Sequence, residues 1–285
     1  MTATTLDVPI TEPGVYPDLA EDTYHAHPAL SSTGARKLMP PSCPALFKHE
    51  RDNGRPPKRS FDLGHAGHLY VLGRGARIVT VDADDWRTKD ARQARDEARA
   101  VGAVPLLAHE DAEARVMAAA LKEHPLAAAL LAAGEPEQSL FWTDEQTGVP
   151  CRARLDLLPE ARRGSRFIVT DYKTCASAER DAVRRSMASY GYHQQAAWYL
   201  EAVRALGLHD RPAFVFIFQE RAAPYLVNVV ELTADALALG AALNHEARQT
   251  FAECTANDHW PGYSERVELI DLPPWSYYVN PEEIR

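Results

Sequence analysis

The stretch RFIVTDYK, residues 166–173, decides the fold of this chain. Its β-branched and aromatic residues predict a strand, and strand alternation places Asp171 and Lys173 on the same face, about 7 Å apart. A carboxylate and an ammonium that project together from a strand end can hold a divalent cation and polarise a phosphate or a water. The alternative is a structural ion pair with neighbouring charges.

The stretch PCRARLDLL, residues 150–158, predicts the strand that comes before it. Alternation places Asp156 on one face together with Arg152 and Arg154. A carboxylate there would meet Asp171 across the sheet, and two Asp oxygens with waters and a carbonyl form a hard oxygen site suited to Mg²⁺ or Mn²⁺. The ordered pattern D-x14-D-x-K favours this site over separate ion pairs.

The helix expected at residues 190–206 carries a polar residue within an aromatic stripe. Tyr192, Gln195 and Tyr199 are spaced i, i+3 and i+7, so they share one face toward the sheet. Aromatic residues at this spacing usually belong to a core, but a buried amide needs hydrogen-bond partners. Gln195 would find them if it faced the carboxylates and the lysine.

The remaining sequence predicts an α/β protein with a mixed central sheet flanked by helices. The catalytic α/β core is expected at residues 135–255, after a helical N-terminal part at 29–134. An irregular arm (1–28) and a C-terminal tail (264–285) complete the chain. Strands are predicted at 76–81, 138–143, 150–158, 166–173, 213–219 and 225–232. Helices are predicted at 31–39, 42–47, 60–72, 84–100, 110–123, 125–133, 178–188, 190–206 and 233–255, with Ser31 or Ser32, Ser42 and Thr233 as N-caps.

Composition excludes several classes of protein. The chain has 285 residues, 46% of them hydrophobic and 25% charged, which argues against disorder and coiled coils. It shows no apolar run of membrane-spanning length and no secretory signal, so a cytoplasmic location without membrane association is expected. Its four cysteines form no C-x-x-C pair, so we expect reduced thiols. A G-x-S-x-G elbow and a phosphate-binding P-loop motif are also absent.

The ordered motifs resemble a known family of nucleases. Asp156, then Asp171-Tyr172-Lys173, then Gln195-Ala-Ala-Trp-Tyr199 resemble the PD-(D/E)XK signature with the Q-x-x-x-Y motif of RecB-type exonucleases. The segments LSSTGARKLM, CPALFKHE, GHAGHLYVLG, EQSLFWTDEQTGVPCRARLDLL and WPGY resemble the exonuclease VIII (RecE-like) PDDEXK domain of phages and prophages. This resemblance spans residues 24–263 and implies one restriction-endonuclease-like domain at 29–263.

The resemblance implies a metal site with more ligands than the two aspartates that the strand pattern predicts. Asp156 and Asp171 would ligate Mg²⁺, with Mn²⁺ able to substitute, and the backbone carbonyl of Tyr172 would complete part of the shell. His68, in the G-x-x-x-H element 64–68, would be a further ligand or lie near the metal, whereas His65 is expected to be structural. The cysteines of iron–sulfur relatives are missing, so no cluster is expected.

The resemblance also assigns catalytic roles. Lys173 would orient or activate the attacking water, and Gln195 and Tyr199 would position Lys173 or the DNA backbone. Glu137 either approaches the site or is an exposed acid at a strand start; the sequence leaves both open. The chain departs from the family pattern in having Leu155 where Pro is common, and Asp in place of Glu in the (D/E)XK element.

The function implied is that of a Mg²⁺-dependent exodeoxyribonuclease. It would process double-stranded DNA ends into single strands, pass them to a single-strand annealing protein and assemble as a ring-shaped homo-oligomer. A non-catalytic DNA-end-binding protein and an endonuclease on the same fold are the alternatives. The net charge is −9, but residues 151–190 carry a basic excess, so phosphate contacts are expected near the site, at Arg152 and Arg154.

Overall fold

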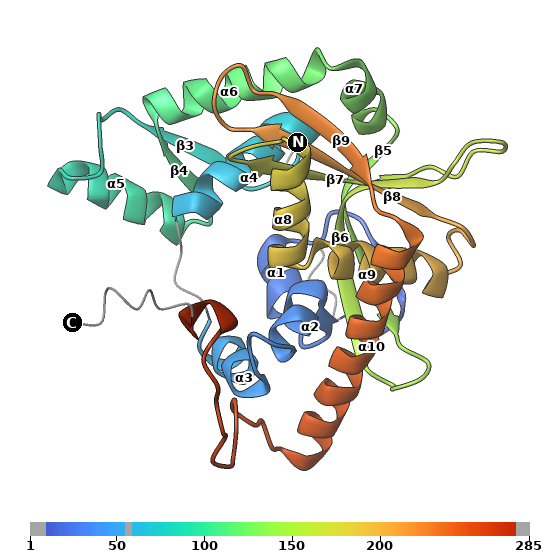
Figure 1. The fold of residues 1–285 in the computed structure, drawn as a ribbon. Helices are drawn as coiled ribbons and strands as arrows, with labels where there is room; N and C mark the ends of the chain where they lie inside the picture. The colour runs from blue at the N-terminus through green and yellow to red at the C-terminus, as the bar shows by residue number, and fades with distance from the viewer. Residues whose placement is uncertain (1–9, 55–58, 278–285) are drawn as a thin grey trace.

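The computed structural model describes residues 10–54 and 59–277 (Figure 1). It contains a seven-stranded mixed sheet in the order β1-β5-β6-β7-β8-β9, with β2 paired to β6, and a small parallel pair, β3-β4. The strands are β1 (Gly14–Tyr16), β2 (Leu30–Ser31), β3 (Ile78–Val81), β4 (Val104–Leu107), β5 (Gly134–Thr143), β6 (Pro150–Pro159), β7 (Ile168–Cys175), β8 (Ala213–Glu220) and β9 (Val227–Glu231). The predicted α/β fold with a mixed central sheet is therefore confirmed.

Helices cover both faces of this sheet. They are α1 (Glu21–Ala26), α2 (Ser32–Leu38), α3 (Pro44–Asn53), α4 (Arg59–Leu72), α5 (Lys89–Ala100), α6 (Ala108–Lys122), α7 (Pro125–Leu131), α8 (Arg180–Tyr190), α9 (Tyr192–Ala205) and α10 (Ala234–Asn257), followed by the short 3₁₀ helix η1 (Pro274–Tyr277). Figure 1 shows α6 and α7 on one side of the sheet and α2, α9 and α10 on the other. None of the described helices is long and apolar enough to cross a membrane.

The sequence of β8, AFVFIFQE, explains why both faces are covered. Phe214, Phe216 and Phe218 alternate toward the larger core beneath α9 and α10. Ile217 points the other way and joins Tyr172 of β7 in the core beneath α4, α6 and α7. A strand that is apolar on both faces is typical of the centre of a sheet that carries helices on each side.

β7 pairs differently with its two neighbouring strands. β7 and β8 run parallel from Ile168–Ala213 to Cys175–Glu220, and α8 and α9 form the crossover between them. β6 and β7 run antiparallel but pair at one position only, Leu157 with Thr170. The two strands therefore separate beyond that pair, which leaves backbone groups there for other partners.

The N-terminal region differs from the expectation of an irregular arm over residues 1–28. Residues Gly14–Tyr16 form β1 at the edge of the sheet, antiparallel to β5, and α1 follows. The local sequence has no periodicity that would predict this order. The order comes from contacts with distant parts of the chain: Arg154 Nη2 donates to the carbonyl of Leu19 at 2.7 Å. Residues 1–9 lie outside the described part of the chain.

Two further local features differ from the expectation. The helix expected at 42–47 is not capped by Ser42: its N-cap is Cys43, Pro44 is at the first turn, and the helix continues to Asn53. Pro lacks the N–H that a cap would satisfy, so it starts a helix without a capping hydroxyl. The buried strand β4 was not predicted, because four residues, VPLL, carry no readable alternation. In contrast, Ser31 caps α2 and Thr233 caps α10, as predicted.

Candidate active site

Asp156 is positioned by the separation of β6 from β7. Its Oδ2 accepts a hydrogen bond from the backbone N–H of Tyr172 at 2.8 Å. Tyr172 pairs with Ile217 of β8 but has no partner on β6, so the carboxylate takes that place, and its own direction is set by the backbone of β7. The structure thus brings two predicted residues of neighbouring strands together.

Three metal-ligating side chains meet at this point. Nδ1 of His68 on α4 lies 3.7 Å from Oδ2 of Asp156 and 3.9 Å from Oε1 of Glu137 on β5. One ligand atom from each of the three lies within 4.8 Å of the others. Of the two possibilities left open for Glu137, the structure shows that it approaches the site. The sequence motif selected His68, whereas Glu137 was not among the predicted ligands.

The backbone and the charge at Glu137 are consistent with a cation in this cluster. In the β5–β6 register, Pro136 pairs with Leu157 and Gln138 with Leu155, so Glu137 and Asp156 lie at the same level of the two strands, where the pairing is interrupted. Like charges at such a position repel. Glu137 also has φ 55°, a left-handed conformation that costs a non-glycine residue about 1 kcal/mol. Two carboxylates and one imidazole fit a divalent cation such as Mn²⁺ or Mg²⁺, which would offset the repulsion.

α4 packs against α6 and β7 at Gly67, the residue before His68. A Cβ atom at Gly67 would lie 3.3 Å from Met117 Cε and 3.6 Å from Tyr172 Cε1. The His68 ring lies 5.5 Å from the Tyr172 ring, centroid to centroid. Burial lowers the pKa of His68, but the charge of Asp156 and the hydrogen bond with Glu137 outweigh burial and raise that pKa overall. The side chain of His65 lies outside what the structure describes.

Asp171 and Lys173 form a second, more deeply buried pair. Asp171 is 1% exposed, its Oδ2 contacts the ammonium of Lys173, and its Oδ1 accepts a hydrogen bond from Gln195 Nε2 at 2.7 Å. Burial raises the pKa of Asp171 to about 6, reinforced by the charge of Asp156 and opposed by Lys173. Burial lowers the pKa of Lys173, but Asp171 and Asp156 outweigh it and raise that pKa, so the amine is charged at neutral pH.

The stripe on α9 faces the Asp171–Lys173 pair, as predicted. Gln195 faces the buried carboxylate, which satisfies its amide. Tyr199 packs against Phe214 with ring centroids 5.9 Å apart. Burial raises the pKa of Tyr199 well above its usual value, although a hydrogen bond with Gln195 opposes that change. Tyr199 therefore stays neutral and can hold the amide of Gln195 in place.

Arg152 and Arg154 have a structural role in place of the predicted DNA contacts. Their guanidinium carbons lie 4.8 Å and 4.5 Å from the centroid of the Tyr24 ring in α1. Arg152 donates to the backbone carbonyl of Tyr24, and Arg154 donates to Leu19 O and, at 2.9 Å, to Ser139 Oγ. Because Nη1 and Nη2 of Arg152 and Nε and Nη2 of Arg154 donate to groups of the protein itself, we correct the expectation that the two arginines form the phosphate path.

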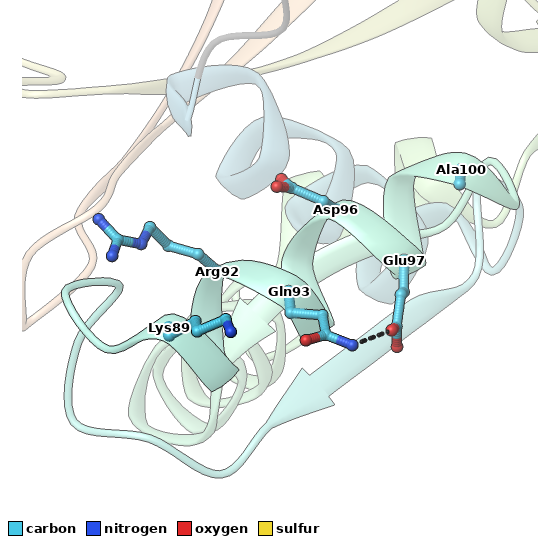
Figure 2. A pocket seen from close by; sticks show the side chains of 6 residues that line it. All are labelled: Lys89, Arg92, Gln93, Asp96, Glu97 and Ala100. Carbon is cyan, nitrogen blue, oxygen red and sulfur yellow. Dashed lines mark hydrogen bonds between the residues drawn. The ribbon is translucent and has the colours of Figure 1, made fainter.

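A hollow on the surface of α5 is separate from these residues. Figure 2 shows it lined by charged and polar side chains of that one helix and by Ala100, with Gln93 Nε2 donating to Glu97 Oε1 at 2.8 Å. None of the predicted site residues lines it. It therefore contributes nothing to the cluster around Asp156 and Lys173.

Comparisons with known proteins agree with this fold. The family profile for the PDDEXK-like domain of unknown function (DUF3799) matches residues 36–273. No curated protein matches the chain. A solved structure from Eubacterium rectale, whose own assignment as an exonuclease is provisional, is 14% identical, with a TM-score of 0.59 over 91% of this chain and 98% of that chain.

A second solved structure is more distant. The phage-related exonuclease from Haemophilus somnus 129PT is 11% identical and covers 81% of this chain and 97% of that chain, with a TM-score of 0.34. That score is too low to support an argument about this chain. At 14% identity, the first structure supports the fold alone. Because the family profile matches most of its length, the chain belongs to the PDDEXK-like family and has a PD-(D/E)XK nuclease fold.

Proposed function

We propose that this chain is a Mg²⁺-dependent deoxyribonuclease that degrades double-stranded DNA from an end. The observation that carries the proposal is the meeting of two clusters. The donors His68, Glu137 and Asp156 lie together, and Asp156 Oδ2 accepts a hydrogen bond from the backbone N–H of Tyr172, the residue between Asp171 and Lys173. A cation site next to a charged lysine is suited to phosphodiester hydrolysis, because that reaction develops negative charge on the phosphate oxygens. Membership in the PDDEXK-like family supports the same reaction class.

The proposed metal ligands combine the sequence prediction with the observed cluster. His68, Glu137 and Asp156 would hold the cation, with Asp171 and the backbone carbonyl of Tyr172 as further predicted ligands. When bound, the metal would polarise the phosphate and lower the pKa of a coordinated water. Mn²⁺ would substitute for Mg²⁺, because an imidazole beside carboxylates suits Mn²⁺ better than an all-oxygen site does.

The protein side chains would supply charge and position. Lys173 is protonated, so it would bind the scissile phosphate, stabilise the negative charge that grows there and orient the attacking water. Gln195 would hold Asp171 through its 2.7 Å hydrogen bond, and Tyr199 would hold Gln195 in turn. These two residues position the reacting groups without touching the phosphate in this proposal.

The finer biological role rests on the sequence resemblance. It supports an exonuclease that exposes single strands, hands them to a single-strand annealing protein, forms a ring-shaped homo-oligomer and acts in the cytoplasm. A non-catalytic DNA-end-binding protein is the runner-up reading. The intact set of Asp156, Asp171 and Lys173 favours catalysis, because nucleases that have lost activity typically lack one of these residues.

The decisive experiment compares linear and covalently closed circular duplex DNA. We expect Mg²⁺ or Mn²⁺ to support degradation of the linear form only, Ca²⁺ to allow binding with little turnover, and EDTA to stop the reaction. Lys173→Ala is the matched negative control. Cleavage of the closed circle would indicate an endonuclease, and full activity in EDTA, or binding without any cleavage in Mg²⁺, would refute the proposal.

A further inference from the structure

Two tyrosines flank the junction between α8 and α9. Tyr190 ends α8 and Tyr192 begins α9, with Gly191 between them at φ 64°. A Cβ at Gly191 would lie 2.8 Å from Cδ of Arg36, so both the left-handed backbone and the tight approach require glycine. Arg36 Nη1 also donates to the carbonyl of Tyr190 at 2.5 Å. The junction therefore holds the two rings in a defined arrangement.

The rings continue a column that begins in the protein core. The Tyr192 ring lies 5.6 Å from Phe216 and 6.0 Å from Phe218, and both phenylalanines are buried in β8. It also lies 5.6 Å from Tyr190 at an interplanar angle of 34°. Tyr190 is 63% exposed. A surface ring that is backed by packed core rings loses little side-chain entropy when a ligand stacks on it.

The column also touches the proposed catalytic lysine. Nζ of Lys173 lies 5.4 Å from the centroid of Tyr192. The exposed Tyr190 ring, 5.6 Å from Tyr192, is therefore no more than about 11 Å from the ammonium. Stacked bases follow each other at about 3.4 Å along a duplex strand, so Tyr190 is within reach of a base a few nucleotides from a phosphate at Lys173.

α8 also exposes Arg184 and Arg185, but helix geometry places them about 120° and 140° around the helix from Tyr190, and Arg184 pairs with Asp181 at 3.1 Å. The platform is therefore the exposed ring itself, because every base has a face that can stack on an aromatic side chain. An isolated exposed tyrosine would have neither the backing rings nor the link to the reacting centre.

We infer that Tyr190 is a stacking platform for a nucleobase of the strand whose phosphate binds at Lys173. The inference rests on the proposed DNA substrate and deepens it, because it specifies how the strand is held next to the reacting phosphate. Stacking on a tyrosine predicts little preference for base sequence. It also predicts that the terminal bases are unpaired from their complement when they occupy the site.

The test uses single-stranded oligonucleotides that carry 2-aminopurine at successive positions from the end. In Ca²⁺, the full-length wild-type protein should quench the probe at one or two positions, because stacking quenches its fluorescence. Tyr190→Ala should abolish that quenching and weaken binding about five- to tenfold. Tyr190→Phe should keep both, because the ring remains. Tyr263→Ala, which removes another exposed tyrosine, is the matched control and should behave as the wild type.

The outcomes separate this inference from the proposed activity. Unchanged quenching in Tyr190→Ala, no quenching by the wild type, or an equal loss in Tyr263→Ala would overturn the platform. Melting temperatures of all variants exclude unfolding as the cause of a loss. If the wild type degrades linear DNA but does not quench, only the platform fails. If it quenches but does not cleave in Mg²⁺, the nuclease proposal fails and the platform stands.

Discussion

Glu137→Gln tests whether the three-donor cluster is a cation site. The substitution removes one of two carboxylates that lie at the same level of β5 and β6 and keeps the shape of the side chain. In the metal-free protein the loss of like-charge repulsion should leave stability unchanged or raise it by up to about 0.5 kcal/mol. A purely structural role for Glu137 predicts the opposite sign.

The magnitude for metal binding follows from the separations in the cluster. Two unit charges about 4 Å apart interact by about 4 kcal/mol at an effective dielectric constant of about 20. Gln still offers one oxygen ligand to the metal, and its neutral amide costs less to desolvate than a carboxylate does. Both effects offset much of the lost charge–charge attraction. We expect at least tenfold weaker Mn²⁺ binding, which corresponds to about 1.4 kcal/mol.

Calorimetry and chemical unfolding with and without Mn²⁺ measure both effects. At a Mn²⁺ concentration about 100 times the wild-type Kd, the wild type gains about 2.7 kcal/mol of stability and a tenfold weaker site gains about 1.4 kcal/mol. Glu135→Gln is the matched control, because Glu135 is an exposed acid two residues earlier in β5. Equal Mn²⁺ affinity in the wild type and both variants would refute the site, as would a large loss of metal-free stability in Glu137→Gln.

Three further predictions concern Lys173 and two buried contacts elsewhere in the fold. Lys173→Met should abolish cleavage while Mn²⁺ binding by calorimetry stays within a few-fold of the wild type; retained turnover would contradict the role of the ammonium. Arg152→Met should speed hydrogen exchange in α1 and cost about 1–3 kcal/mol, because the buried carbonyl of Tyr24 loses its donor, and unchanged exchange would show that the anchor is dispensable. Asp111 accepts hydrogen bonds from Tyr70, from Thr80 at 3.1 Å and from Arg115 at 3.3 Å; burial raises the pKa of Asp111, but these bonds outweigh burial and lower it overall. The stabilising effect of the Asp111 carboxylate is then complete above the ordinary pKa of 3.8 and is lost as pH falls below that value. The difference in unfolding free energy between wild type and Asp111→Asn, measured by urea unfolding, should therefore shrink below pH 3.8. A constant difference would contradict this.

Local periodicity predicted the parts of the site that lie within one element. Alternation in β7 placed Asp171 and Lys173 together, and helical spacing in α9 placed Gln195 toward them; the 2.7 Å hydrogen bond to Asp171 confirms that contact. Such predictions succeed because the geometry of one strand or helix is the same wherever it lies in a fold. The family resemblance added His68, which no local pattern distinguishes from His65.

Only the tertiary structure decided which distant side chains meet. Glu137 joins the cluster because the β5–β6 register sets it at the same level as Asp156, and α4 packs against β7 at the residue before His68. Arg152 was predicted to bind DNA, but the carbonyls of the N-terminal segment take its donors. The amino-acid sequence by itself determined the face on which Asp171, Lys173 and Gln195 project. Distances between elements depend on register and on the packing of segments far apart in the chain, which local periodicity does not encode.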